Sequence, residues 1–153
     1  PGVKRFASHP LFLWAGVDTW LRHYDRSQPR MKVTHSLSTI DDSYFTIVLN
    51  TNPYTYLGSR PLSLAPHATL SNGLSVVALR TMSFKTMLGL LKDLFEGKPL
   101  ENCDAVHVAN DLAELSIVGH SPFPYQLDGD YLGEVNHLDF SWRPNILRLV
   151  IPT

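Results

Sequence analysis

Residues 31–37 constrain the fold most, because their apolar character changes at every second position. Met31, Val33, His35 and Leu37 alternate with polar side chains, which is the pattern of a strand with one buried face. Residues 43–51 are rich in aromatic and β-branched side chains and predict a second, more deeply buried strand. Residues 74–80 follow an Asn-Gly turn signal and predict a third. Short strands of this kind indicate a mainly antiparallel β domain.

Two other segments have the three- and four-residue spacing of helices. Residues 9–24 place Leu11, Trp14 and Leu21 on one face, while residues 83–96 start after a Ser83 cap and stop at Gly97. Further strands are predicted at 105–108, 115–118, 125–127, 135–142 and 146–151, with a turn at Asp128-Gly129. The expected fold class is therefore mostly β (α+β), an antiparallel two-layer β-sandwich with one or two packed helices.

Size and composition exclude several classes of protein. The 153 residues suit one domain with its own core. The single cysteine excludes an internal disulfide framework and a cysteine-rich zinc site, and the seven histidines lack the paired spacing of a zinc-binding helix. A formal net charge of -1 argues against binding to duplex nucleic acid. The sequence also lacks a P-loop, a G-x-G-x-x-G fingerprint and a G-x-S-x-G elbow.

Two polar segments could carry chemistry. In residues 122–130, Asp128-Gly129 by itself indicates a hairpin turn, and the carboxylate of Asp130 just past it could accept a proton from an attacking hydroxyl. Residues 64–74 again indicate a turn, and their alternative interpretation is a small oxygen-ligand site around the Asn72 side chain. The residues alone leave the structural and the functional interpretation open for both segments.

Several motifs follow one another along nearly the whole chain. Lys4-Arg5-Phe6 leads into the first helix, residues 48–51 precede Tyr56 and Gly58, and residues 65–76 read A-P-H-A-T-L-S-N-G-L-S-V. The second helix ends at Gly97-Lys98, residues 122–133 read P-F-P-Y-Q-L-D-G-D-Y-L-G, and residues 146–152 read I-L-R-L-V-I-P. In this order the motifs resemble the C-terminal domain of the bacterial diacylglycerol kinase-like lipid kinases, which belong to the diacylglycerol and sphingosine kinase superfamily and are related to NAD kinases.

The resemblance implies roles for individual residues. Asp130 occupies the acidic position of the family's D-G-E motif, the general base that activates the lipid hydroxyl, and its side chain reaches about 1.5 Å less far than Glu. The family's second-domain metal site corresponds to Asn72, Thr69 and Leu74. Because Asn72 replaces an Asp, this site lacks its only formal charge and is less suited to a tightly held Mg²⁺. Asn50 and Tyr56 are expected to line or brace an interdomain cleft.

The resemblance also implies that part of the enzyme lies outside this chain. The family binds ATP through an N-terminal domain with a G-G-D-G-(T/S) segment, which these residues lack. We expect residues 1–153 to be the C-terminal, lipid-acceptor domain of an ATP- and Mg²⁺-dependent kinase, inactive on its own. The expected substrate is diacylglycerol or a related lipid, and the expected location is cytoplasmic, peripheral at the inner membrane face. No nucleic-acid partner is expected, and a homodimer is left open.

Two alternatives accompany this interpretation. The first is a non-catalytic lipid-binding or regulatory β module that keeps the fold without the chemistry, as the Asn72 and Asp130 departures suggest. The second is a kinase of the same superfamily that acts on a sphingoid base or on NAD.

Overall fold

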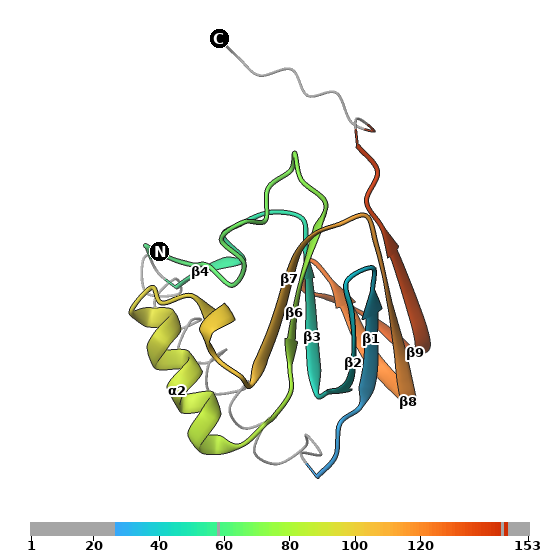
Figure 1. Cartoon of the computed structure of the whole chain (residues 1–153), viewed down its shortest axis with the longest axis horizontal. Coiled ribbons are helices and arrows are strands. Elements are labelled where there is room, and N and C mark those ends of the chain that lie inside the picture. The colour runs from blue at the N-terminus through green and yellow to red at the C-terminus, as the bar shows by residue number, and fades with distance from the viewer. Residues whose placement is uncertain (1–26, 58, 145, 147–153) are drawn as a thin grey trace, which may run out of the picture.

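In the described part of the chain the strands form two main antiparallel sheets and one small hairpin (Figure 1). The computed structural model describes residues 27–57, 59–144 and 146. Sheet A has the strand order β2-β1-β8-β9 and sheet B the order β3-β6-β7. The strands of sheet A are β1 (Met31–His35), β2 (Ser38–Ser43), β8 (Glu114–Leu127) and β9 (Asp130–Ser141). Those of sheet B are β3 (Phe45–Leu49), β6 (Leu74–Leu79) and β7 (Val106–Leu112).

The chain passes between the two sheets at two places. It leaves β2 for β3 at Tyr44, whose N–H donates to the Leu79 carbonyl at 2.8 Å. It leaves β7 for β8 at Ala113, whose carbonyl accepts from the Trp142 N–H at 2.8 Å. These hydrogen bonds tie each crossing to a neighbouring strand, so the sheets stay in contact along two corners.

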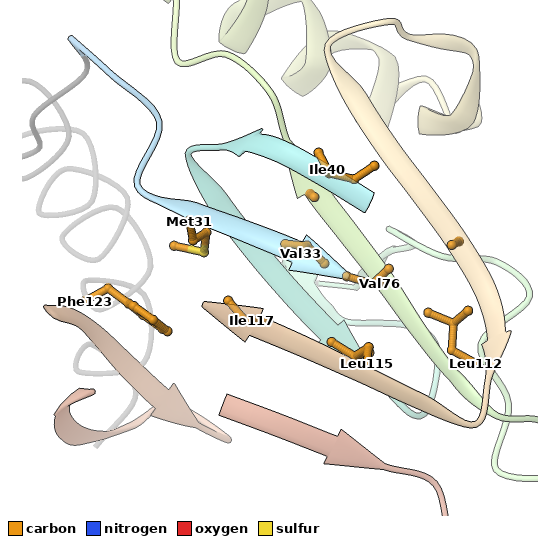
Figure 2. Close-up of a cluster of buried hydrophobic side chains, with 10 residues drawn as sticks. Met31, Val33, Ile40, Val76, Leu112, Leu115, Ile117 and Phe123 are labelled. Carbon is orange, nitrogen blue, oxygen red and sulfur yellow. The ribbon is translucent and has the colours of Figure 1, made fainter. Parts of the chain in front are cut away.

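The larger core lies between sheets A and B (Figure 2). Val33 of β1, Val76 of β6 and Leu112 of β7 are 0%, 0% and 1% exposed, respectively. Burying one such side chain contributes about 1.5–3 kcal/mol to stability. The remaining members of this core are Met31, Ile40, Ala78, Ala109, Leu115, Ile117 and Phe123. The alternation is thus explained for residues 31–35, since Met31 and Val33 pack against side chains of sheet B.

A helical layer covers the other face of sheet B. It consists of α2 (Phe84–Phe95) and the 3-10 helix η1 (Leu100–Asn102), and Figure 1 shows α2 on the side of sheet B away from β1 and β2. Leu90 of α2 and Leu100 of η1 pack in one cluster with Val77 of β6. Because β6 is covered on both faces, its sequence reads as a nearly continuous apolar run. The predicted fold class, an antiparallel β-sandwich with a packed helix, is confirmed.

The ends of α2 agree with the signals in the sequence. The Ser83 side chain accepts a hydrogen bond from the Thr86 N–H at 3.2 Å, which caps the first turn. Gly97 takes a positive φ of 72° at the other end, and the Lys98 N–H donates to the Asp93 carbonyl.

Some strand predictions were incomplete. β1 ends at His35, so Leu37 lies in the following turn and is 75% exposed. β2 was not predicted, because an edge strand with the sequence STIDDS has few apolar side chains to reveal it. β8 is one strand of 14 residues where two short ones were expected. The predicted helix at 9–24 and the strand at 146–151 lie outside the described residues, apart from Ile146.

Candidate functional site

Asp130 lies at the tip of the hairpin that β8 and β9 form. It pairs with Leu127 across the turn, and the two turn residues Asp128 and Gly129 both have positive φ, at 51° and 94°. Two consecutive positive φ angles define the tight turn that Asp-Gly favours, so the predicted hairpin turn is confirmed. The carboxylate of Asp130 is exposed to solvent and stands on the first residue of β9.

The hairpin changes course before it reaches this tip. Its pairing register shifts between Val118 and Phe123, and the partner strand β1 pairs with β8 only as far as Gly119. A Cβ on Gly119 would lie 2.6 Å from the Phe123 ring and 2.4 Å from the Ser121 carbonyl oxygen. Gly119 therefore allows β8 to turn sharply and to insert Phe123, 4% exposed, into the core. Among the described residues, the segment beyond Phe123 pairs only with β9.

The tip itself combines carboxylates with exposed apolar side chains. Asp128, Asp130 and Glu134 are exposed, and Leu127, Tyr131 and Leu132 are 62%, 67% and 51% exposed. A second register shift between Tyr125 and Gln126 leaves Leu132 as the extra residue of β9, next to Gly133 with a φ of 107°. An exposed carboxylate beside apolar side chains can accept a proton from an amphipathic alcohol.

A second group of predicted residues meets at one end of sheet B. Asn50 directly follows β3, and Leu74 is the first residue of β6. Because Leu49 pairs with Ser75, Asn50 and Leu74 lie next to each other just beyond that pair. Thr69 and Asn72 close the turn just before β6, and the Asn72 N–H donates to the Thr69 carbonyl at 3.1 Å. The fold thus brings Asn50, Thr69, Asn72 and Leu74 to one edge, while Asp130 stands on a different element.

Asp111 joins this edge, although the sequence did not indicate it. A bulge in β7, opposite the start of β6, gives Asp111 a φ of 58°, and its Oδ1 accepts a hydrogen bond from the Gly73 N–H at 2.9 Å. Gly73 is buried against the same segment, and a Cβ there would lie 2.7 Å from the Leu112 carbonyl oxygen. The Asn-Gly pair is thus needed for close backbone contact as well as for the turn.

The three predicted metal ligands do not fit a tightly held divalent cation. Asn72 contributes a neutral amide, the Thr69 carbonyl already accepts a hydrogen bond, and Leu74 could offer only its backbone carbonyl. Mg²⁺ sites normally include at least one carboxylate. The described part of the chain contains no group of three His, Cys, Asp or Glu side chains that could hold a metal ion. We therefore assign no chemical step to a metal at this edge.

Tyr56, the other predicted cleft residue, lies on the small hairpin of β4 (Thr55–Leu57) and β5 (Arg60–Leu62). It pairs with Pro61 and is 60% exposed. The hairpin belongs to the connection between β3 and β6, which a hydrogen bond from the Ser63 hydroxyl to the Asn52 side chain closes at 2.9 Å. Both Asn50 and Tyr56 thus lie at the surface, where another domain could reach them.

A polar hollow on the molecule was not predicted from the sequence. Its lining includes Asp42, Arg80 and His107. Arg80 binds both carboxylate oxygens of Asp42, with a shortest distance of 2.9 Å, and this hydrogen bond lowers the pKa of Asp42. Asp42 binds Arg80 through Nε and Nη2 and offsets its charge, so this pair attracts an anionic ligand only weakly.

Among the described residues, no helix is long and apolar enough to cross a membrane. The described residues form an α+β sandwich. It carries the exposed Asp130 carboxylate on the bent β8–β9 hairpin and a cluster of loops around Asn72 at one end of sheet B.

The fold matches about half the length of several solved structures that are named as diacylglycerol kinases. A structure named "putative diacylglycerol kinase" from Bacillus anthracis str. Sterne matches 86% of this chain and 47% of its own, with a TM-score of 0.53 and 16% identity. A diacylglycerol kinase from the same organism matches over 80% of this chain and 45% of its own, with the same TM-score and identity. A third structure from that organism has a TM-score of 0.51. No protein-family model and no curated protein matches the chain.

Proposed function

We propose that this chain is the lipid-acceptor domain of an ATP-dependent lipid kinase. The observation that carries the proposal is the fold that 86% of the chain shares with structures named as diacylglycerol kinases. The chain spans about half the length of those structures, so the complete kinase would need a second part. The D-G-D turn supports the same interpretation, because it sets the Asp130 carboxylate at an exposed position on the first residue of β9.

In the proposed reaction, Asp130 acts as the general base. Its carboxylate takes the proton of the lipid hydroxyl while the hydroxyl oxygen bonds to the γ-phosphorus of ATP. The bond between that phosphorus and the bridging oxygen of ADP breaks, which leaves ADP and a phosphorylated lipid. The exposed apolar side chains next to Asp130 would contact the acyl or glycerol part of the acceptor.

ATP and Mg²⁺ would be bound mainly by the nucleotide-binding part of the complete protein. Phosphoryl transfer requires that the phosphates be held and their charge neutralised. Asn50 and Tyr56, both exposed around the β3–β6 connection, would brace the contact between the two parts.

The test uses the full-length protein with labelled ATP and diacylglycerol in mixed micelles. Asp130→Asn removes the proton acceptor with little change in shape, and we expect kcat to fall by about 100-fold or more. Asp128→Asn is the matched control, because Asn tolerates the same positive φ and the charge change is identical. Full activity of Asp130→Asn would rule out its role as base. Absence of diacylglycerol phosphorylation by the unaltered full-length protein would exclude a diacylglycerol kinase.

A further inference from the structure

Helix α2 has a second apolar surface that does not face the core. Its core side includes Met87 and Leu90, which pack against sheet B. Leu88, Leu91 and Phe95 lie on the neighbouring side and are 58%, 47% and 45% exposed. Steps of three and four residues align these three side chains along about 10 Å of one face. We call Leu88, Leu91 and Phe95 the outer face of α2.

Two lysines flank the outer face along its length. Lys85 precedes Leu88 by three residues, and Lys92 follows it by four, so both are surface neighbours of Leu88. Lys85 and Lys92 are seven residues apart and therefore point in nearly the same direction, away from the core side. The Lys92 side chain is 71% exposed, and Glu96 lies 3.9 Å from its Nζ.

The acidic side chains of this region lie further around the helix. Asp93 and Glu96 both form ion pairs with Lys98, at 3.2 and 2.7 Å. Lys98 balances only one of these two negative charges, and Glu96 also pairs with Lys92, so the three lysines and two carboxylates of this region leave a net charge of +1. Neither carboxylate lies on the outer face. Around the helix the order is core-facing apolar side chains, the outer face, the two lysines, and then the two acids.

This order is that of an amphipathic helix lying in the plane of a membrane interface. Such helices insert apolar side chains among the acyl chains, while flanking lysines extend to the headgroups. Lysines at that depth also attract anionic headgroups, which a protein partner would match only with carboxylates of its own. α2 is suited to this role by its position, since among the described residues it lies on the side of sheet B away from sheet A (Figure 1).

We propose that the outer face of α2, together with Lys85 and Lys92, docks on the surface of a bilayer that contains anionic lipids. The proposal rests on the proposed function in one respect, because a kinase with a diacylglycerol acceptor must reach a substrate embedded in a bilayer. It names the surface that makes this contact, on the opposite side of sheet B from sheet A.

The experiment measures co-sedimentation of the whole 153-residue chain with phosphatidylcholine vesicles, with and without phosphatidylglycerol. We expect binding to the vesicles that contain phosphatidylglycerol, and weaker binding at high salt. The double variant Leu88→Ser/Leu91→Ser should bind these vesicles at least about tenfold more weakly than the unaltered chain. The double variant Lys85→Gln/Lys92→Gln should show a comparable loss and little remaining salt dependence.

Two controls match these variants. Leu37→Ser removes an apolar side chain that is 75% exposed in the β1–β2 turn, and Lys32→Gln removes a cation from sheet A. Both should bind like the unaltered chain. The urea unfolding midpoint of Leu88→Ser/Leu91→Ser should fall only slightly, because serine favours a helix less than leucine does, and the midpoints of the other variants should stay unchanged because the substituted side chains are exposed.

Four results would overturn the proposal. The first is absence of binding to the anionic vesicles. The second is unchanged binding of the leucine double variant and the lysine double variant. The third is a dimer in sedimentation equilibrium that Leu88→Ser/Leu91→Ser converts to a monomer, which would assign the face to a second copy. The fourth is a large loss of stability in that variant, which would mean that another segment of the chain covers the face. The vesicle assay uses no nucleotide, so it tests membrane binding even if the protein proves not to be a kinase.

Discussion

The Nε2 atoms of His35 and His107 lie 3.0 Å apart and join the two sheets of the sandwich. His35 stands at the end of β1 in sheet A and His107 on β7 in sheet B, and their rings stack with centroids 5.2 Å apart. A hydrogen bond between two imidazole nitrogens requires that one donate and the other accept, so both rings cannot be protonated while it lasts. The pair is thus a polar link that depends on neutral histidine.

This link predicts that the protein becomes less stable in acid. Burial lowers the pKa of His35, and burial, together with the positive charges of His35 and Arg80, lowers the pKa of His107. Below the ordinary histidine pKa of about 6.5 the unfolded chain therefore binds more protons than the folded one. The contribution of the pair is fully present above that pH and is lost as the pH falls through the folded-state pKa values. Urea unfolding midpoints measured from neutral to mildly acidic pH should show this decline.

A variant separates this pair from other titrating groups. His107→Gln keeps a polar side chain but cannot take up a proton, so its stability should depend less steeply on pH over the same range. The variant should also be less stable at neutral pH, by about 1–3 kcal/mol if the buried His35 loses its partner. His67→Gln, at an exposed loop position, serves as the control. An unchanged pH slope in His107→Gln would contradict the assignment.

Gly73 should tolerate no side chain. A Cβ at this position would lie 2.7–2.8 Å from backbone atoms of Asp111 and Leu112, which cannot move without opening the β6–β7 pairing. We expect Gly73→Ala to lower the free energy of unfolding by about 1–3 kcal/mol, or more. Gly89→Ala is the matched control, because no atom of the described residues crowds the added carbon within 4 Å and alanine favours a helix. Urea denaturation should show a stabilised Gly89→Ala and a destabilised Gly73→Ala.

The helix cap at Ser83 predicts a smaller effect. Its side chain satisfies the Thr86 N–H, which has no partner of its own in the first turn. Ser83→Ala should cost about 1 kcal/mol, while Ser83→Asp should retain the capping hydrogen bond and most of the stability. Thermal unfolding followed by circular dichroism would compare the three proteins. Equal stability of Ser83→Ala and the unaltered protein would mean that the cap contributes nothing measurable.

Local physics explains which parts of this structure the sequence revealed. The Ser83 cap, the Gly97 end of the helix and the Asp128-Gly129 turn depend on neighbours within a few residues, and all three were predicted. The β2 strand was missed, because edge strands carry polar side chains. The Asp111–Gly73 contact and the His35–His107 pair were also missed, since each joins residues far apart in the sequence, 38 and 72 positions, respectively. The role of Asp130 came from the family resemblance and stays a prediction.

The edge around Asn72 predicts how the protein responds to Mg²⁺. Asn72 and the neighbouring carbonyls carry no formal charge, and the Asp111 carboxylate at this edge already accepts the Gly73 N–H, so adding Mg²⁺ should leave the Tm of the protein unchanged. Asn72→Asp would place a carboxylate next to Gly73, whose N–H holds the Asp111 carboxylate. Two carboxylates at this edge should bind Mg²⁺, and a concentration about tenfold above Kd would stabilise the variant by about 1.4 kcal/mol, a few degrees in Tm. Ser71→Asp adds the same charge one residue earlier and should show a smaller response. A Tm increase in the unaltered protein would show that oxygen donors other than Asn72 complete a metal site at this edge.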